Sequence, residues 1–248
     1  MFSQSVTKFS KRLVKLAKVL AYGDYRAALR KSGVAAAIEH ERILKVLACR
    51  TVVDIGANRG QFALVSRHCC PEATIISFEP LTAPAQRFHA ALDGDPRVTF
   101  HEAAVGTDNG EAVMHVSAED DSSSLLPMTP LQETLFSGTS EVATETVRIV
   151  TLDQRLSADE IRSPALLKID VQGYELTTLR GCEALLDQFT YVYVECSFVE
   201  LYEGQSLADE VIAYLREHGF KLVGTYNIHY DDAGRAIQAD FLFSHAAA

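Results

Sequence analysis

The sequence has no tryptophan, few cysteines and no long apolar run. The cysteine pattern and the lack of a long apolar run each exclude certain classes of protein. The five cysteines are odd in number and show no CxxC pair or other zinc-binding spacing, as is typical of buried free thiols. No apolar run approaches the roughly 20 residues that span a bilayer, and the N-terminus lacks the apolar core of a secretory signal. We therefore expect a protein of the reducing cytoplasm.

Positive charge is scarce except at the N-terminus. Residues 1–32 carry eight lysines and arginines against one aspartate, a charge of +7, which leaves −17 for the remainder of a chain whose net charge is −10. Such an acidic body argues against a nucleic-acid partner. Residues 6–20 form a basic amphipathic pattern. Such a segment can bind peripherally to the anionic inner face of a membrane. Alternatively, it can pack on the domain itself or on the partner of a homodimer.

A glycine turn at 51–60 (TVVDIGANRG) is the most informative motif. Thr51–Val53 predicts a strand, and a helical pattern begins at Gln61, so the turn lies where open α/β sheets bind ligands. The G-x-G-x-x-G spacing of dinucleotide-binding proteins is absent, and an acid precedes the first glycine. This spacing favours a nucleoside with a cationic amino-acid end, which is the shape of S-adenosylmethionine, although an ordinary βα turn has similar glycines. The residues expected to bind this end are Asp54, Gly56, Ala57, Asn58 and Gly60.

Two further strand ends extend the predicted binding site. The strand at 73–78 ends in Glu79 and Pro80, and an acid at roughly this distance from the glycine turn binds ribose hydroxyls in Rossmann units. The strand at 98–105 ends in Ala103 and Ala104, which are small enough to border an adenine. The plainer alternatives are a solvated charge at the rim of the sheet and a strand end with small residues.

An insertion is predicted where the next helix of a βαβ unit is expected. Residues 111–116 and 144–151 have strand patterns, and a polar stretch at 117–141 lies between them. We expect a β-arm with a mobile loop, in which Ser123 and Ser124 close over the site; a disordered surface loop is the alternative. The predicted domains are a helical extension at 1–40 and a Rossmann-like domain at 41–248, with the insertion at about 107–151.

Acidic residues also end the two later strands. Lys168 and Asp170 lie two residues apart at the end of the strand at 165–169, so they share a face of the strand, and Glu195 ends the strand at 191–195. A buried charged pair is costly, which favours a functional role over a salt bridge at the sheet edge.

Taken together, these motifs resemble the FkbM family of S-adenosylmethionine-dependent methyltransferases. The resemblance covers about 49–244 and rests on VVDIGANRGQFA, SFEP, AAVG, SSSL, TLD, KIDVQGYE, LRG, a strand ending in VE, and ADFLF. Gln172 departs from the family, which usually has glutamate there. The resemblance implies an α/β, Rossmann-like class I methyltransferase fold: a seven-stranded, mainly parallel sheet with one antiparallel strand and helices on both faces. It also implies O-methylation, often of sugar hydroxyls in glycans, glycolipids or secondary metabolites.

A sugar hydroxyl is a weak nucleophile, so this chemistry needs a base or a divalent metal. Asp170 is the first candidate, either as the base itself or as a ligand of Mg²⁺, and Glu195 is the second; no spacing in the sequence demands a metal. Lys168 would orient the hydroxyl or keep Asp170 ionised. His229 and His245 are remote candidates. The competing hypotheses are an NAD-dependent oxidoreductase, a non-catalytic Rossmann domain docked to a membrane, and a nucleic-acid methyltransferase.

Overall fold

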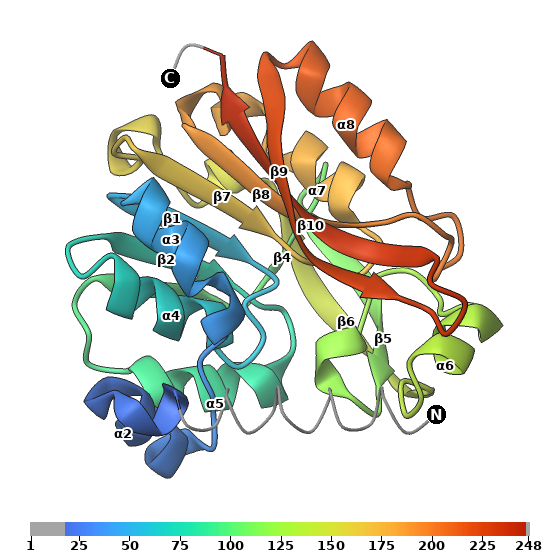
Figure 1. Cartoon of the computed structure of the whole chain (residues 1–248), viewed down its shortest axis with the longest axis horizontal. Coiled ribbons are helices and arrows are strands. Elements are labelled where there is room, and N and C mark those ends of the chain that lie inside the picture. The colour runs from blue at the N-terminus through green and yellow to red at the C-terminus, as the bar shows by residue number, and fades with distance from the viewer. Residues whose placement is uncertain (1–17, 247–248) are drawn as a thin grey trace.

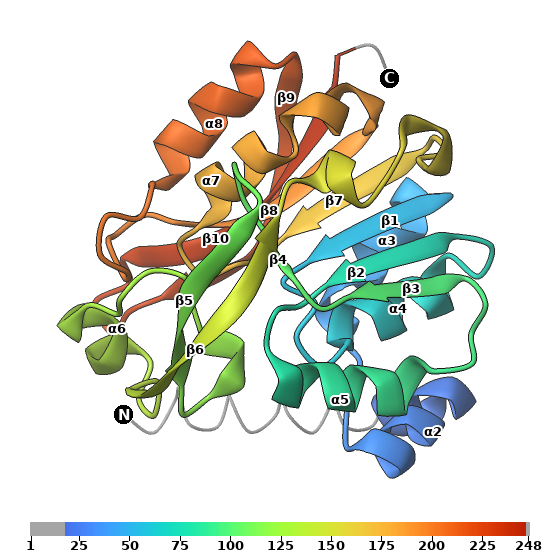
Figure 2. The same cartoon turned by 180° about the vertical axis from the view of Figure 1, so that it is seen from behind.

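A seven-stranded sheet forms the centre of the protein in the computed structural model, which describes residues 18–246. Helices cover both of its faces (Figures 1 and 2). The strand order is β3-β2-β1-β7-β8-β10-β9. The strands are β1 (Thr51–Ile55), β2 (Thr74–Phe78), β3 (Val98–His101), β7 (Ala165–Ile169), β8 (Tyr191–Ser197), β9 (Phe220–Tyr230) and β10 (Ala236–His245).

One strand of this sheet runs against the others. β10 is antiparallel to both of its neighbours, β8 and β9, whereas β1, β2, β3, β7 and β8 pair in parallel. The predicted fold class is therefore confirmed. β9 and β10 form the closing hairpin, and both strands continue to a tight turn in which the Asp231 N–H donates to the Arg235 carbonyl over 2.9 Å.

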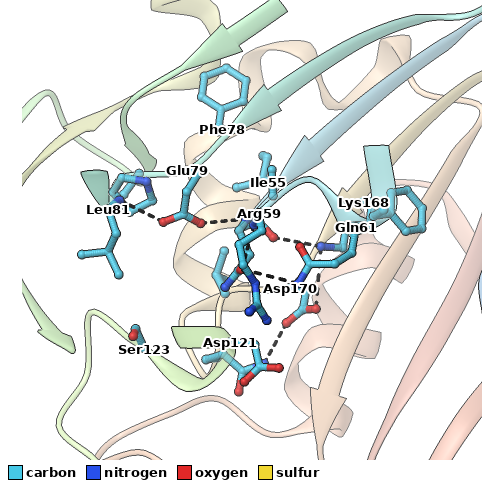
Figure 3. A pocket seen from close by; sticks show the side chains of 18 of the residues that line it. Ile55, Arg59, Gln61, Phe78, Glu79, Leu81, Asp121, Ser123, Lys168 and Asp170 are labelled. Carbon is cyan, nitrogen blue, oxygen red and sulfur yellow. Dashed lines mark hydrogen bonds and ion pairs between the residues drawn. The ribbon is translucent and has the colours of Figure 1, made fainter. Parts of the chain in front are cut away.

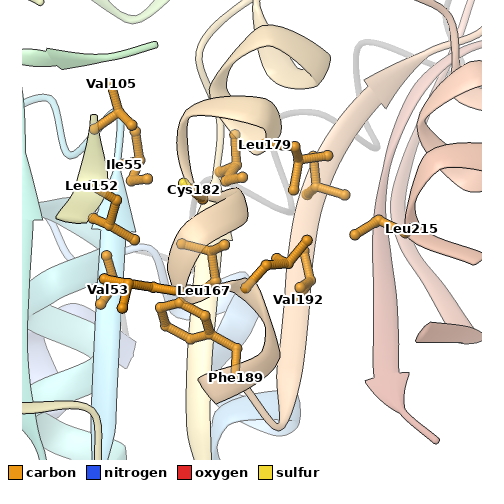
Figure 4. Close-up of a cluster of buried hydrophobic side chains, with 14 of the residues drawn as sticks. Val53, Ile55, Val105, Leu152, Leu167, Leu179, Cys182, Phe189, Val192 and Leu215 are labelled. Atoms are coloured by element: carbon orange, nitrogen blue, oxygen red, sulfur yellow. The ribbon is translucent and has the colours of Figure 1, made fainter. Parts of the chain in front are cut away.

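Two hydrophobic cores lie on opposite faces of the sheet, because alternate residues of each central strand point to opposite sides. Val52 and Leu166 belong to one core, and Val53 and Leu167 to the other. Both faces are covered, so β1 and β7 are buried along their whole length. The first core packs under α2 (Gly23–Ser32), α3 (Glu41–Leu47), α4 (Gln61–Cys69) and α5 (Thr82–Leu92). The second, drawn in Figure 4, packs under α7 (Glu175–Gly181), a 3₁₀ helix η5 (Glu183–Gln188) and α8 (Ala208–Glu217).

The predicted β-arm forms a separate three-stranded sheet in the order β4-β6-β5. Its strands are β4 (Ala104–Val105), β5 (Gly110–Ser117) and β6 (Glu141–Val150). The single strand expected at 98–105 is divided, because β3 stays in the main sheet and β4 joins the arm. The polar stretch at 117–141 contains a 3₁₀ turn η2 (Asp120–Ser122) and the helix α6 (Pro130–Leu135), and is therefore more ordered in secondary structure than a plain loop.

The N-terminal part of the described chain is helical, with the predicted break. α2 ends at Gly33, whose φ of 73° is left-handed and whose N–H donates to the Leu29 carbonyl. A short 3₁₀ helix, η1 (Ile38–His40), leads into α3. Within residues 18–246, no helix has both the length and the apolar composition needed to cross a membrane.

Gly181, the last residue of α7, marks the closest approach between α7 and the start of the arm. A Cβ atom there would lie 2.2 Å from the carbonyl oxygen of Gly106, a contact that only a backbone shift could relieve. We expect Gly181→Ala to destabilise the fold by roughly 1–3 kcal/mol, as overpacking does. Thermal and urea unfolding would measure this. Gly23→Ala is the matched control, because a Cβ there meets only the end of the Arg26 side chain at 3.8 Å. Equal stability of the two variants would contradict the prediction.

Candidate functional site

The glycine turn after β1 packs directly against the end of β7. Gly56 has a φ of 79°, and a Cβ atom on it would lie 1.8 Å from the Asp170 carbonyl oxygen, so only glycine fits. The Gly56 carbonyl oxygen accepts a hydrogen bond of 3.1 Å from Nζ of Lys168. Glycine is therefore required at position 56 because the ends of β1 and β7 pack against each other. This requirement does not depend on a ligand in the cavity.

The N–H groups of the turn are already hydrogen-bonded within the protein. Those of Gly56 and Ala57 donate to the Phe78 carbonyl over 3.0 and 2.9 Å, and that of Asn58 donates to Oε2 of Glu79 over 2.9 Å. These hydrogen bonds hold the turn against the end of β2.

Gly60 serves packing between helices. It caps α4 with a φ of 91°, and a Cβ atom would meet the Phe88 ring at 2.9 Å and Leu92 at 3.1 Å, both on α5. Gly60 does not belong to the cavity lining. The structure thus places Gly60 outside the cavity lining and against α5.

Glu79 joins the ends of β1 and β2 from a buried position. Its Oε1 accepts the Leu81 N–H over 2.9 Å, while its Oε2 accepts that of Asn58. The residue is 5% exposed, yet it lines the cavity together with Pro80. A carboxylate oxygen has two acceptor positions, so each can hold a backbone N–H and also accept from a ligand hydroxyl.

A group of three charges, of which Asp54 and Lys168 are buried and Asp170 is partly exposed, lies on the other side of the turn. Nζ of Lys168 is 3.2 Å from Oδ1 of Asp54 and 3.7 Å from Oδ2 of Asp170. Burial alone would lower the pKa of Lys168, but Asp54 and Asp170 beside it outweigh burial and raise it. Burial raises the pKa of the fully buried Asp54, and the charge of Lys168 opposes that shift. Asp54 thus holds Lys168 in place from beneath the site.

A cavity of about 510 Å³ opens at the carboxyl ends of β1, β2 and β7, a size suited to a small-molecule ligand. Figure 3 shows Glu79 and Asp170 on opposite sides of the turn, with Asp121 and Ser123 of the arm facing it. The predicted site residues that line the cavity are Gly56, Ala57, Asn58, Glu79, Pro80, Ala103, Ala104, Ser123, Lys168 and Asp170. The predicted residues outside the lining are Asp54, Gly60, Ser124 and Glu195.

Ser124 and Glu195 act on the cavity only through Gln172. Oγ of Ser124 donates to the Gln172 carbonyl over 2.6 Å, which fastens the arm to the loop after β7. Nε2 of Gln172 donates to Oδ1 of Asp170 and to Oε2 of Glu195, each over 2.8 Å. Burial, together with the charges of Asp170 and Asp240, raises the pKa of Glu195 well above its ordinary value. Glu195 is consequently less suited than Asp170 to meet a substrate.

Glu175 fixes the loop between β7 and α7. Its buried Oε1 accepts the N–H groups of Gly173 over 2.9 Å and of Val171 over 3.3 Å. Burial raises the pKa of this carboxyl to about 7, against these hydrogen bonds, which lower it. Glu175 therefore supports the loop that carries Asp170 and Gln172, and of the GYE part of the motif Tyr174 lines the cavity whereas Gly173 and Glu175 do not.

The sequence did not indicate that the N-terminal segment lines the cavity. Gly33, Val34, Ala35, Ala37, Glu39 and His40 all contribute to the wall. No motif marks them, because their place depends on how the segment folds over α4. The two histidines named from the sequence lie elsewhere: the His229 ring is 6.1 Å from that of Phe136, and the His245 ring is 4.9 Å from that of Phe220. Neither lines the cavity.

Metal ligands are not gathered in the described part of the chain. Within residues 18–246, no group of three or more histidine, cysteine, aspartate or glutamate side chains could hold a metal ion. The alternative role of Asp170 as a ligand of Mg²⁺ stays a prediction.

The strand order with the single reversed strand, and a cavity at the carboxyl ends of β1, β2 and β7, define the Rossmann-like fold of class I methyltransferases. Residues 54–222 match the methyltransferase FkbM domain, more than half of the chain. The protein therefore belongs to the FkbM methyltransferase family.

Two relatives and one solved structure illustrate this membership. The 2-O-methyltransferase NoeI of Sinorhizobium fredii is 31% identical over 165 residues, which are 62% of this chain and 66% of NoeI. The hexuronic acid methyltransferase AglP of Haloferax volcanii is 26% identical over 57% of this chain and 54% of its own length. The match thus spans about half to two thirds of these relatives. The crystal structure of an FkbM methyltransferase from Methylobacillus flagellatus superposes with a TM-score of 0.50 at 14% identity, over 78% of this chain and 44% of that one.

The buried ion pair generates a stability prediction. Lys168→Met leaves the Asp54 carboxylate buried without its cation, and we expect a loss of about 3–5 kcal/mol in the free energy of unfolding. The variant Asp54→Leu/Lys168→Met should recover much of it, because no buried charge remains. In Lys168→Met the pKa of Asp54 rises further above its unfolded value, so stability should fall as pH rises from 5 to 8. Urea unfolding at both pH values would measure this, and a pH-independent loss would contradict it.

Proposed function

We propose that the protein is an S-adenosylmethionine-dependent O-methyltransferase that acts on a sugar hydroxyl. The observation that carries the proposal is the position of Glu79 and Asp170. These two acids lie on opposite sides of one glycine turn, in one cavity, on a fold whose family consists of methyltransferases. One acid suits the ribose of the cofactor, and the other suits the end of the cavity where the methyl group is transferred.

The polar and apolar groups that line the cavity fit this cofactor. Glu79 offers carboxylate oxygens to ribose hydroxyls, and Ala103 and Ala104 line the cavity together with the apolar Phe78 and Leu81, a lining that suits an adenine. The turn at 56–58 and Asp170 offer carbonyl and carboxylate oxygens to the amino group of the methionine end. When bound, S-adenosylmethionine supplies an electrophilic methyl group on its sulfonium.

The acceptor end of the cavity is rich in polar groups with fixed positions. Asp170, with a side chain 36% exposed, is held by Lys168 on one side and by Gln172 on the other. An acceptor hydroxyl would be oriented there by hydrogen bonds to this carboxylate. Lys168 is committed to Asp54 and to the Gly56 carbonyl, so its role is to position Asp170 and the turn.

Support for a sugar acceptor comes from the relatives. One is named for methylation at a 2-O position and the other for methylation of a hexuronic acid. We would therefore assay transfer of a radiolabelled methyl group from S-adenosylmethionine to p-nitrophenyl glycosides of neutral hexoses and of glucuronic acid. Transfer to a glycoside, with the label retained after mild alkali, would support an ether product. A label lost to alkali would indicate a methyl ester and overturn the O-methylation of a hydroxyl.

The alternative functions are separated by cofactor binding. Calorimetric titration with S-adenosylhomocysteine, with NAD in parallel, should give micromolar affinity for the first and none for the second. Binding of NAD alone would favour the oxidoreductase hypothesis, and binding of neither would favour a non-catalytic Rossmann domain. The absent G-x-G-x-x-G spacing counts against NAD.

Glu79 provides a sharper test of the cofactor site. We expect Glu79→Gln to weaken the affinity for S-adenosylhomocysteine by roughly 1.5–3 kcal/mol, the range for a hydrogen bond to a charged group. Glutamine keeps one oxygen acceptor, so the turn is less disturbed than in an alanine variant. The control is Glu102→Gln, which alters an exposed carboxylate that accepts from Thr82 outside the cavity. Calorimetry would measure both variants, and an unchanged affinity of Glu79→Gln would remove Glu79 from the site.

Most of the basic segment at 6–20, namely residues 6–17, lies outside the described residues, so its role remains a proposal based on composition. We propose that it holds a cytoplasmic protein peripherally on anionic lipid. Sedimentation with vesicles containing phosphatidylserine should retain the full chain and lose a variant without residues 1–20, whereas phosphatidylcholine vesicles should retain neither. Equal sedimentation of both forms would contradict the proposal. The homodimer and the domain boundaries also stay predictions.

A further inference from the structure

The N-terminal segment contributes a histidine to the wall of the cavity. The Ala37 N–H donates to the Gln61 carbonyl over 3.0 Å, which fixes the segment at the start of α4. His40 follows at the end of η1 and lines the cavity, with its side chain 15% exposed. Its ring lies 5.2 Å from that of Phe62 and 5.6 Å from that of Tyr193, so packing on two sides limits its rotation.

One nitrogen of this ring is engaged in a buried polar network. Nδ1 of His40 lies 3.1 Å from the Tyr193 hydroxyl. That hydroxyl donates to Oδ2 of Asp240 over 3.0 Å, and Nδ2 of Asn227 donates to the same oxygen over 2.7 Å. Tyr193, Asn227 and Asp240 come from three adjacent strands, β8, β9 and β10. The network is therefore built by the far half of the sheet, yet it holds a histidine at the cavity.

The network favours one tautomer of the ring. A tyrosine hydroxyl has a single proton, and when Tyr193 gives it to Asp240 its oxygen accepts from His40, which favours a proton on Nδ1. Nδ2 of Asn227 is also 3.4 Å from Nδ1, but its shorter contact of 2.7 Å is to Asp240. In a neutral imidazole the lone pair consequently lies on Nε2.

Burial is the main reason that the His40 ring favours its neutral form. Burial lowers the pKa of His40, and the positive charge of Lys168 lowers it further. The negative charges of Asp240, Glu39 and Asp170 oppose this shift without reversing it. These acids would stabilise an imidazolium formed during a reaction.

We propose that His40 is the general base of the methyl transfer, with Nε2 accepting the proton of the acceptor hydroxyl. Tyr193, Asn227 and Asp240 are positioning residues that fix its tautomer. The inference rests on the proposed function. In the step, the acceptor oxygen forms a bond to the methyl carbon as the carbon–sulfur bond breaks. The electron pair of the broken bond stays on sulfur, and the hydroxyl proton moves to Nε2 and then to solvent.

The tautomer can be measured without an acceptor. ¹⁵N NMR of the full chain labelled at histidine should show His40 protonated at Nδ1 and unprotonated at Nε2 at pH 7.5, with titration below pH 6.5. His40→Gln assigns the signal. In Tyr193→Phe the Nδ1 partner is lost, and a mixture of tautomers should appear. Protonation at Nε2 in the unmodified protein would overturn the proposal.

Activity then tests the base directly, with the p-nitrophenyl glycoside that the unmodified protein methylates fastest. We expect His40→Gln to lower kcat by roughly 10²–10⁴-fold, the range for general base catalysis, with little change in KM. In His40→Ala, added imidazole should restore part of the rate, which a purely structural role would not permit. In Tyr193→Phe, kcat should fall by about tenfold, the value of one hydrogen bond.

The pH profile and controls separate this inference from the proposed function. The unmodified protein should lose activity below pH 6.5 as His40 is protonated, and His40→Gln should lose this acid limb. His229→Gln, a histidine outside the cavity, should match the unmodified protein. If His40→Gln binds S-adenosylhomocysteine and keeps full kcat, the base proposal fails while the function stands. If the unmodified protein does not bind S-adenosylhomocysteine, the proposed function itself fails.

Discussion

The ion pair between Asp54 and Lys168 supports every other part of the site. The two residues face each other in the register of β1 and β7, with the carboxylate completely buried and the ammonium 3.2 Å away. Because a buried charge without a partner is costly, neither side chain can leave this position. The same ammonium holds the Gly56 carbonyl and Asp170. One cation thus fixes the glycine turn and the acid at the acceptor end relative to each other.

The register of the neighbouring strands completes this arrangement. Ile55 of β1 pairs with Phe78 of β2 on one side and with Ile169 of β7 on the other, so all three strands end level. The chain leaving each strand therefore enters the same cavity, which explains why Gly56, Glu79 and Asp170 meet although they are far apart in sequence. A register shift by one residue would turn the side chains of a strand to the opposite face of the sheet.

The local patterns of the sequence predicted the strands, the glycine turn, the β-arm and the acids at strand ends. The fold class followed from the resemblance, including the reversed strand. Contacts that depend on packing were not predictable. Gly60 was assigned to the cofactor, but its neighbours are Phe88 and Leu92, which no spacing reveals. The N–H groups of the turn bind Phe78 and Glu79, and no spacing in the sequence indicates these partners. His40 carries no motif, because its partners lie on β8, β9 and β10.

Gln172 stands where the family usually has glutamate, and the contacts of its side chain explain what the amide provides. Its amide donates to Asp170 and Glu195 and accepts from the Tyr202 hydroxyl over 2.9 Å, so all of its polar atoms have defined partners. A glutamate there could bridge the two carboxylates only by holding a proton, and the bridge would then depend on pH. The amide keeps Asp170 in place without titrating. An Asp170 held in this way is suited to orienting a hydroxyl, and the transfer of a proton is left to a group such as His40, whose charge can change.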